Sequence, residues 1–177
     1  MTSVNEYCLT IDDSHPMTTA RGHIQGLAYQ AAKCQTILEL GSHRGFSTAA
    51  MAIAAPLARI VSVDLCDTVT QEERVEYWKS LGIKNIYPVR SSAGDYLARC
   101  LIAGDKFDLV FHDAAHGDAV ADEYLACAEI ASVLAIHDWE QLGSEYQDDL
   151  INRFASWEAT ADAKGRSLFL EIGRAHV

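Results

Sequence analysis

Acidic and histidine side chains follow two apolar segments in the second half of the chain. Asp113 and His116 come directly after Phe107–His112, and His137 and Asp138 end the next apolar segment. If these segments are neighbouring strands, their carboxylates can hold a divalent cation such as Mg²⁺ through oxygen atoms. A bound metal would lower the pKa of a substrate hydroxyl. His116 could then collect the proton, because imidazole titrates near neutral pH.

A second group of residues has the spacing of a nucleoside-binding site. Glu39 lies in a short apolar run that leads to Gly41 and Gly45, and glycine lets the backbone turn tightly and approach a ligand. The helix expected over residues 46–55 would point its free N–H groups at that ligand. The next apolar segment ends near Asp64, whose carboxylate can accept hydrogen bonds from a ribose diol.

The glycine spacing favours a cationic nucleoside cofactor over a dinucleotide. Gly-x-x-x-Gly differs from the Gly-x-Gly-x-x-Gly that packs a helix against a pyrophosphate. Glu39 would repel phosphates and attract an amino or sulfonium group. The alternative is an ordinary strand–turn–helix unit whose glycines serve only the turn.

These side chains require a sheet that brings them to one edge. Strands and helices are expected to alternate along the whole chain, which predicts one α/β domain with a Rossmann-like, doubly wound, mainly parallel sheet and helices on both faces. Ligands of such sheets bind beyond the carboxyl ends of the strands, where the candidate residues fall. The expected strands begin near residues 36, 60, 86, 107, 133 and 167, and the expected helices span 17–34, 46–55, 70–81, 93–103 and 118–131.

Local signals refine two of these elements. Pro88 interrupts the third strand, which places that strand toward a sheet edge. Ser144 and Gln147 have the spacing of a capping box that begins a last helix. Leu150 and Phe154 recur in that helix at helical spacing.

Composition excludes several classes of protein. With 177 residues, the chain suits one domain, and a net charge of -11 argues against binding to nucleic acid or an anionic membrane. No apolar run reaches membrane-spanning length, and the first residues lack a secretion signal. The five cysteines contain no C-x-x-C pair, which suits a reduced cytoplasm.

Together the motifs resemble the class I S-adenosylmethionine-dependent methyltransferases. Residues 17–170 are similar to the small metal-dependent O-methyltransferases, which include catechol and caffeoyl-coenzyme A O-methyltransferases and bacterial enzymes that methylate sugars and natural products. This resemblance implies methyl transfer from S-adenosylmethionine to a hydroxyl of a small molecule, with Mg²⁺ as a second cofactor. A homodimer is the default expectation for the assembly.

The resemblance also implies roles for individual residues. It makes Asp113 and His116 catalytic, with His116 as the general base. The implied metal ligands are Asp113, His137 and Asp138. The implied cofactor-binding residues are Glu39, Gly41, Gly45 and Ser47 for the methionine part, Asp64 for the ribose, and Ser91, Ser92 and Ala93 for the adenine.

The remaining polar residues are expected to have ordinary roles. His43 should be a turn side chain and His112 a buried histidine with satisfied hydrogen bonds. The other acidic residues are expected to lie on solvated helix faces.

Two other functions agree with part of the sequence. A nicotinamide-dependent oxidoreductase would use a similar strand–glycine–helix unit, although the glycine spacing and Glu39 argue against it. A binding module would keep the cofactor pocket without the chemistry.

The end of the chain needs separate treatment. Residues 171–177 read Glu-Ile-Gly-Arg-Ala-His-Val, the translation of a widely used sequencing adapter. We therefore expect an N-terminal tail at 1–16, a methyltransferase domain at 17–170 and an artefact at 171–177. The last antiparallel strand of the sheet would then be missing through truncation, which would leave an exposed sheet edge.

Overall fold

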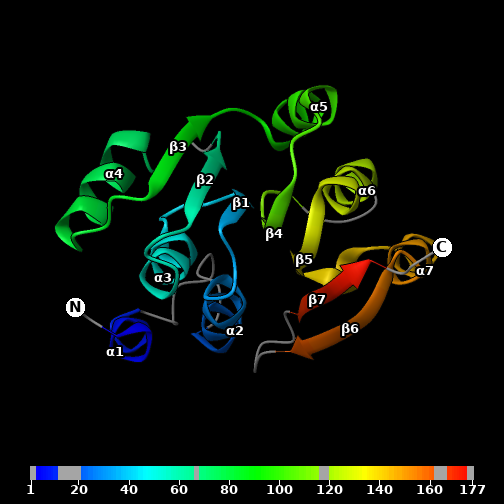
Figure 1. The fold of residues 1–177 in the computed structure, drawn as a ribbon, viewed down its shortest axis with the longest axis horizontal. Coiled ribbons are helices and arrows are strands. Elements are labelled where there is room, and N and C mark those ends of the chain that lie inside the picture. Colours follow the sequence, from blue (N-terminus) through cyan, green and yellow to red (C-terminus); the bar gives the residue numbers. More distant parts are fainter. Residues whose placement is uncertain (1–2, 12–20, 66–67, 116–119, 162–166, 175–177) are drawn as a thin grey trace.

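A computed structural model shows helices on both faces of one sheet (Figure 1). The structure describes residues 3–11, 21–65, 68–115, 120–161 and 167–174. For Glu140 and for residues 155–161 and 167–174 it describes the backbone alone.

The sheet has seven strands in the order β3-β2-β1-β4-β5-β7-β6. Strand β7 pairs antiparallel with both β5 and β6, and the other paired neighbours run parallel. The carboxyl ends of β1, β2 and β4 therefore meet at one edge. The strands are β1 (Thr36–Leu40), β2 (Arg59–Asp64), β3 (Ile86–Arg90), β4 (Phe107–His112), β5 (Ala131–His137), β6 (Phe154–Ala161) and β7 (Ser167–Arg174).

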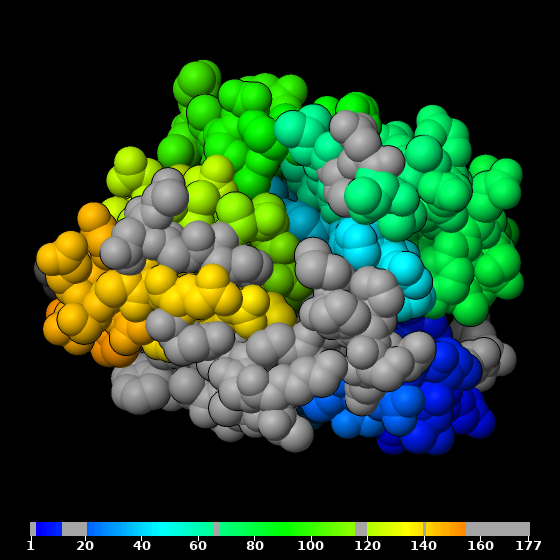
Figure 2. All heavy atoms as spheres, turned by 180° about the vertical axis from the view of Figure 1, so that it is seen from behind, coloured from blue at the N-terminus to red at the C-terminus, as the bar shows by residue number. Residues whose placement is uncertain are grey.

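The helices form two layers. Helices α1 (Val4–Leu9), α2 (Arg21–Ala31), α3 (Phe46–Ala54) and α4 (Gln71–Ser80) cover one face. Helices α5 (Ala93–Ala103), α6 (Ala121–Ile130) and α7 (Ser144–Ile151) cover the other. Seen from behind, α1 in dark blue lies against the surfaces of α3 and α4 (Figure 2). No helix among the described residues has the length and apolarity needed to span a membrane.

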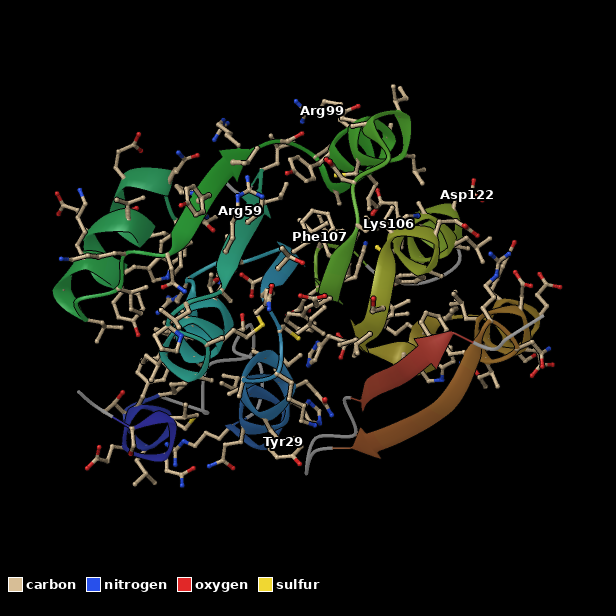
Figure 3. The ribbon with its side chains drawn as sticks, in the orientation of Figure 1. Tyr29, Arg59, Arg99, Lys106, Phe107 and Asp122 are labelled. Carbon is tan, nitrogen blue, oxygen red and sulfur yellow. The ribbon has the colours of Figure 1, made fainter. Side chains whose placement is uncertain are left out.

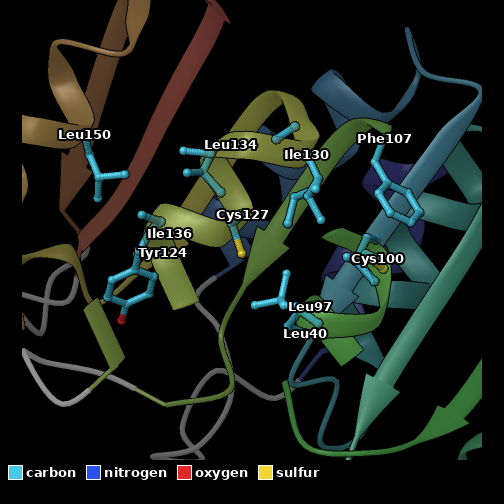
Figure 4. Packing of buried hydrophobic residues seen from close by; sticks show 14 of the residues in the cluster. Leu40, Leu97, Cys100, Phe107, Tyr124, Cys127, Ile130, Leu134, Ile136 and Leu150 are labelled. Carbon is cyan, nitrogen blue, oxygen red and sulfur yellow. The ribbon is translucent and has the colours of Figure 1, made fainter. Parts of the chain in front are cut away.

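Alternation along β1 explains how one strand serves both layers, because successive side chains point to opposite faces of a sheet. Leu38 and Leu40 pack in the cluster that includes α5 and α6, whose buried side chains are shown in Figure 4. Ile37 packs against α2 and α3 on the opposite face. Glu39 shares that face with Ile37, and this placement decides its role in the site.

Helix α4 has a capping box at its start, and the edge position predicted for β3 is confirmed. Thr70 and Glu73 form a capping box at the start of α4. Strand β3, which contains Pro88, lies at the edge of the sheet.

The prediction for the last helix is wrong in two details. Helix α7 ends at Ile151, and Phe154 begins β6. Leu150 and Phe154 are buried in the same core cluster, so apolar spacing alone did not separate the helix from the strand. The N-cap residue is Gly143, and the Gln147 side chain instead donates to the carbonyl oxygens of Trp139 and Leu142, at 3.1 and 2.8 Å.

The antiparallel strand that we expected to be missing is present as β7. Strand β7 begins at Ser167, where sequence analysis expected the sixth strand to begin, and continues to Arg174. It therefore includes residues 171–174 of the segment that sequence analysis set aside. The sheet uses these residues for backbone pairing, in which side-chain identity has little part. The sequencing-adapter origin of 171–177 stays a prediction, and residues 175–177 lie outside the described residues.

Candidate active site

A cavity of about 380 Å³ lies beyond the carboxyl ends of β1, β2 and β4, beside the first turns of α5 and α6. This is the edge at which ligands bind in open parallel sheets, and the volume lies within the usual range for small-molecule sites. Six of the residues that line it carry the argument below: Gly41, Asp64, Ser92, Ala93, Asp113 and Glu123.

Gly41 fastens the β1 turn to the end of β4. Its φ of +88° lies in the left-handed region, and a Cβ at this position would overlap the backbone of Asp113 and Ala114. Backbone hydrogen bonds join Gly41 N to Val63 O at 2.8 Å and Asp113 N to Leu40 O at 2.7 Å. The tight turn is therefore confirmed. Glycine is required here because the turn packs closely against the backbone of Asp113 and Ala114.

Gly45 has a similar relationship with α4. It is the N-cap of α3, with a φ of +77°, and a Cβ there would lie 2.6 Å from Nε1 of Trp78. The same Nε1 donates a hydrogen bond of 3.0 Å to the carbonyl oxygen of Gly45. Gly45 is not among the residues that line the cavity. The lack of a side chain at this position makes room for the Trp78 ring.

Glu39 is completely buried. Ser47 Oγ donates to Oε1 at 2.5 Å, while Thr48 Oγ1 and Ser62 Oγ donate to Oε2. Burial raises the pKa of Glu39 to about 7, with a contribution from the charge of Asp113, although the hydroxyl donors lower it. Glu39 and Ser47 thus bind each other and do not line the cavity, where we had expected both to contact the methionine part of a cofactor.

Asp64 ends β2 and lines the cavity as predicted. Its Oδ2 accepts a 2.5 Å hydrogen bond from the backbone N–H of His43 and lies 3.7 Å from Nη1 of Arg74. Arg74, which is 3% exposed, also donates to the carbonyl oxygens of His43 and Val69. Arg74 therefore holds two loops around Asp64.

Sequence analysis missed Arg74. Its only signal was its position four residues before Trp78, which places a charged side chain on the buried face of α4.

Among the described residues, two other than glycine have positive φ, and both lie where strands meet the site. His43 has a φ of 41° and Asp138 a φ of 54°. Such conformations are uncommon outside glycine and occur often at functional sites. His43 lines the cavity through the turn that Arg74 and Asp64 hold.

Ser92 and Ala93 reach the cavity through the start of α5. Ser92 is the N-cap, and its Oγ accepts from Asp95 N at 3.1 Å. The neighbouring Ser91 Oγ accepts a 2.7 Å hydrogen bond from Arg99 Nη2. All three residues predicted for the adenine edge line the cavity, and the two hydroxyls also fix its wall.

Asp113, His137 and Asp138 form one cluster at the ends of β4 and β5. Nδ1 of His137 lies 3.1 Å from Asp113 Oδ1 and 3.3 Å from Asp138 Oδ1. Burial alone would lower the pKa of His137, but hydrogen bonds to the two carboxylates and their charges raise it to about 10. The cluster is therefore an imidazolium between two carboxylates at neutral pH, and Asp113 is its member on the cavity wall.

This arrangement does not fit the predicted Mg²⁺ site. Nδ1 of His137 lies between the two carboxylates whose oxygens would bind the cation, within 3.3 Å of each. No group of three acidic, cysteine or histidine side chains suited to a metal occurs in the parts of the chain that the structure describes. His116, the predicted general base, lies outside those parts.

Glu123 also lines the cavity, although sequence analysis assigned it to a solvated helix face. Its Oε2 lies 2.9 Å from Nε2 of His112, which is completely buried. The available signal was its spacing of four residues from the buried Cys127 on α6.

The fold and the cavity together define a Rossmann-like α/β protein with a ligand site at the carboxyl ends of its parallel strands. The sequence profile of a family described as a methyltransferase domain matches residues 38–139. This range runs from β1 to Trp139, two residues beyond the end of β5. The match covers more than half of the chain. The chain therefore belongs to this methyltransferase family, in agreement with the resemblance to class I enzymes.

Solved structures of O-methyltransferases share the fold. TomG from Streptomyces achromogenes, involved in tomaymycin synthesis and solved in complex with SAM, has 17% identity and a TM-score of 0.70, with 92% of this chain and 84% of that chain covered. A putative O-methyltransferase from Klebsiella pneumoniae has 18% identity and a TM-score of 0.69, with 91% and 84% covered. The Bacillus cereus O-methyltransferase in complex with SAH has 15% identity and a TM-score of 0.67, with 96% and 90% covered. No curated protein matches the chain significantly.

Proposed function

We propose that this protein transfers a methyl group from S-adenosylmethionine to a hydroxyl group of a small molecule. The observation that carries the proposal is the pair of carboxylates, Asp64 and Asp113, on one cavity at the ends of β2 and β4. The methyltransferase family match and the O-methyltransferases of similar fold support it.

The cavity suits the cofactor in size and in chemistry. Asp64 offers a carboxylate to the ribose hydroxyls, and Ser92 and Ala93 present the start of α5 to the adenine. The Gly41 turn and Asp113 remain for the methionine end. S-adenosylmethionine would supply an electrophilic methyl group on its sulfonium, so the protein must position an acceptor oxygen and remove its proton.

Asp113 is the described residue best placed to orient the acceptor. Its side chain is 18% exposed at the cavity, while His137 holds Oδ1 at 3.1 Å. A carboxylate fixed in this way can accept a hydrogen bond from a substrate hydroxyl and hold its oxygen in line with the methyl group, and such positioning supplies much of the rate in a bimolecular transfer. His116, three residues later, is proposed as the general base.

The proposal includes no metal ion. Nδ1 of His137 lies between the other two predicted ligands, 3.1 Å from Asp113 Oδ1 and 3.3 Å from Asp138 Oδ1. The chemistry assigned here rests on Asp113 and His116.

Two measurements test the proposal. Isothermal titration with S-adenosylhomocysteine should show micromolar binding, and a panel of phenols, sugars and other hydroxyl compounds should include an acceptor of the radiolabelled methyl group. Binding without transfer to any acceptor would favour a cofactor-binding module. Binding of NAD(H) in place of S-adenosylhomocysteine would favour an oxidoreductase.

A further inference from the structure

Glu123 is a charged side chain on the cavity wall that the proposed mechanism does not use. It belongs to the first turn of α6 and faces the first turn of α5, which includes Ala93 and Gly94. Glu123 Oε1 lies 3.0 Å from the position that a Cβ on Gly94 would take. Glycine at that position lets the carboxylate approach the start of α5.

A buried histidine fixes the orientation of this carboxylate. His112 is 0% exposed, its Nε2 lies 2.9 Å from Glu123 Oε2, and its ring packs edge-on against Tyr124 at 4.7 Å. A carboxylate only accepts hydrogen bonds, so Nε2 carries the proton and donates it. Oε2 is thereby held by His112, and Oε1 is directed toward α5 and the cavity.

The charge of Glu123 is not neutralised by a lysine or arginine in the described parts of the chain. Its one ion-pair contact there is with His112. Its side chain is 24% exposed on a cavity wall. A half-buried carboxylate without a lysine or arginine partner is suited to accept hydrogen bonds from a ligand.

We propose that Glu123, positioned by His112, accepts a hydrogen bond from the exocyclic amine of the adenine and so selects adenine over bases with an oxygen at that position. The inference rests on the proposed function, because it assumes that the nucleoside of the cofactor lies at the start of α5. Adenine carries an amine donor beside a ring-nitrogen acceptor. The carboxylate complements the amine, and free backbone N–H groups in the first turn of a helix complement the acceptor.

A base with a carbonyl in place of the amine would bring its oxygen against Glu123 Oε1. Two acceptors then face each other, which leaves both without a donor and disfavours binding. The site should therefore discriminate strongly against hypoxanthine.

The test compares S-adenosylhomocysteine with S-inosylhomocysteine by isothermal titration. In the inosyl compound a carbonyl replaces the amine, and the neighbouring ring nitrogen carries a proton. The wild-type protein should bind the adenosyl compound at least about tenfold more tightly, as expected for the loss of a charged hydrogen bond. Glu123→Gln should lower the ratio of the two dissociation constants several-fold, and the part of the preference that remains is due to the ring nitrogen. The reason is that His112 Nε2 keeps the new amide oxygen, and the amide N–H₂ then faces the cavity and can donate to the carbonyl of the base.

Asp122→Asn is the matched control. Asp122 precedes Glu123 on α6, is exposed and points away from the molecule (Figure 3), so the change removes the same charge without altering the cavity. This variant should keep the wild-type ratio.

The outcomes separate this inference from the proposed function. Binding of S-adenosylhomocysteine with the same ratio in wild-type protein and Glu123→Gln would overturn the role of Glu123 and leave the methyltransferase proposal standing. Failure of the folded wild-type protein to bind S-adenosylhomocysteine would overturn both.

Discussion

Nδ1 of His137 lies 3.1 Å from Oδ1 of Asp113, in the position where two strand ends would otherwise offer carboxylate oxygens to a cation. His137 brings its own positive charge to this position, because Asp113 and Asp138 raise its pKa to about 10. The site thus holds one positive charge between two negative ones.

The first prediction concerns metal removal. Dialysis against EDTA should leave methyl transfer unchanged, and added Mg²⁺ should not increase it, because the carboxylates already have a cationic partner in His137. The measurement is the initial rate with the best acceptor, before and after chelation. Activity that disappears with EDTA and returns with Mg²⁺ would show that a metal displaces the imidazole proton.

The second prediction concerns Asp113. Asp113→Asn should lower kcat by roughly 100-fold or more, as expected for loss of a group that orients or deprotonates a substrate. Affinity for S-adenosylhomocysteine should change much less, because other residues bind the nucleoside. Steady-state kinetics and titration separate the two effects, and the exposed Asp105→Asn is the control of equal charge change. Equal losses in kcat and in cofactor affinity would assign Asp113 to binding.

The third prediction concerns Asp64. Asp64→Asn should weaken binding of S-adenosylhomocysteine by roughly 10- to 100-fold, the range expected when a charged hydrogen-bond acceptor is lost. The His43 turn should also loosen, because Asp64 Oδ2 accepts its N–H and lies beside Arg74. Titration of S-adenosylhomocysteine into Asp64→Asn, with Asp105→Asn as the control, measures the effect. Unchanged affinity would place the ribose elsewhere.

The fourth prediction is a pH dependence of stability. The pKa of Glu39 is about 7 in the folded protein and near 4.5 without burial. The folded state therefore binds the proton more tightly, so its stabilising contribution is present below pH 4.5 and is lost as pH rises through 7. The size of the loss is on the order of 3 kcal/mol.

Glu39→Gln should remove this dependence. Urea unfolding of wild-type and variant protein at several values from pH 5 to 8 measures it, and the variant should gain stability relative to wild type as pH rises. A difference that stays constant with pH would mean that Glu39 keeps an ordinary pKa.

The fifth prediction separates strain from overlap at Gly41. Gly41→Ala should destabilise the protein by roughly 2–5 kcal/mol, because it adds a left-handed alanine and a clash with the Asp113 backbone. Gly104→Ala is the control: its φ is +72°, but no atom lies near the new methyl group, so only the conformational cost of about 1–2 kcal/mol applies. Similar losses in urea unfolding would show that the β1 turn moves away from β4 at little cost.

Much of the fold follows from local sequence signals. Alternation between short apolar runs and amphipathic segments predicts every strand from β1 to β5, and Ile86–Arg90 and Ala93–Ala103 match the predicted bounds. The region after Ile151 does not follow, because Phe154 keeps an apolar spacing that a helix and a strand can share. Strand β7 was missed in part because its last residues were set aside for their resemblance to an adapter.

The site is less accessible to sequence reasoning. Asp64 and Asp113 were found because parallel topology puts the carboxyl ends of β2 and β4 at one edge of the sheet. Arg74 and Glu123 come from helices, and their contacts depend on which helix packs against which loop. Glu39 was predicted to contact the cofactor, but its side chain lies on the face of β1 that α3 covers and is bound by Ser47 and Ser62. Local sequence does not show which face of a strand a helix will cover.

The position of β7 has a consequence for how the protein is made. Strand β6 is synthesised before β7 but pairs in the sheet only through it (Figure 1). On the ribosome, β6 must therefore wait with unpaired backbone groups until the next strand emerges and inserts between it and β5. Newly made chains should be most prone to capture by chaperones during this interval.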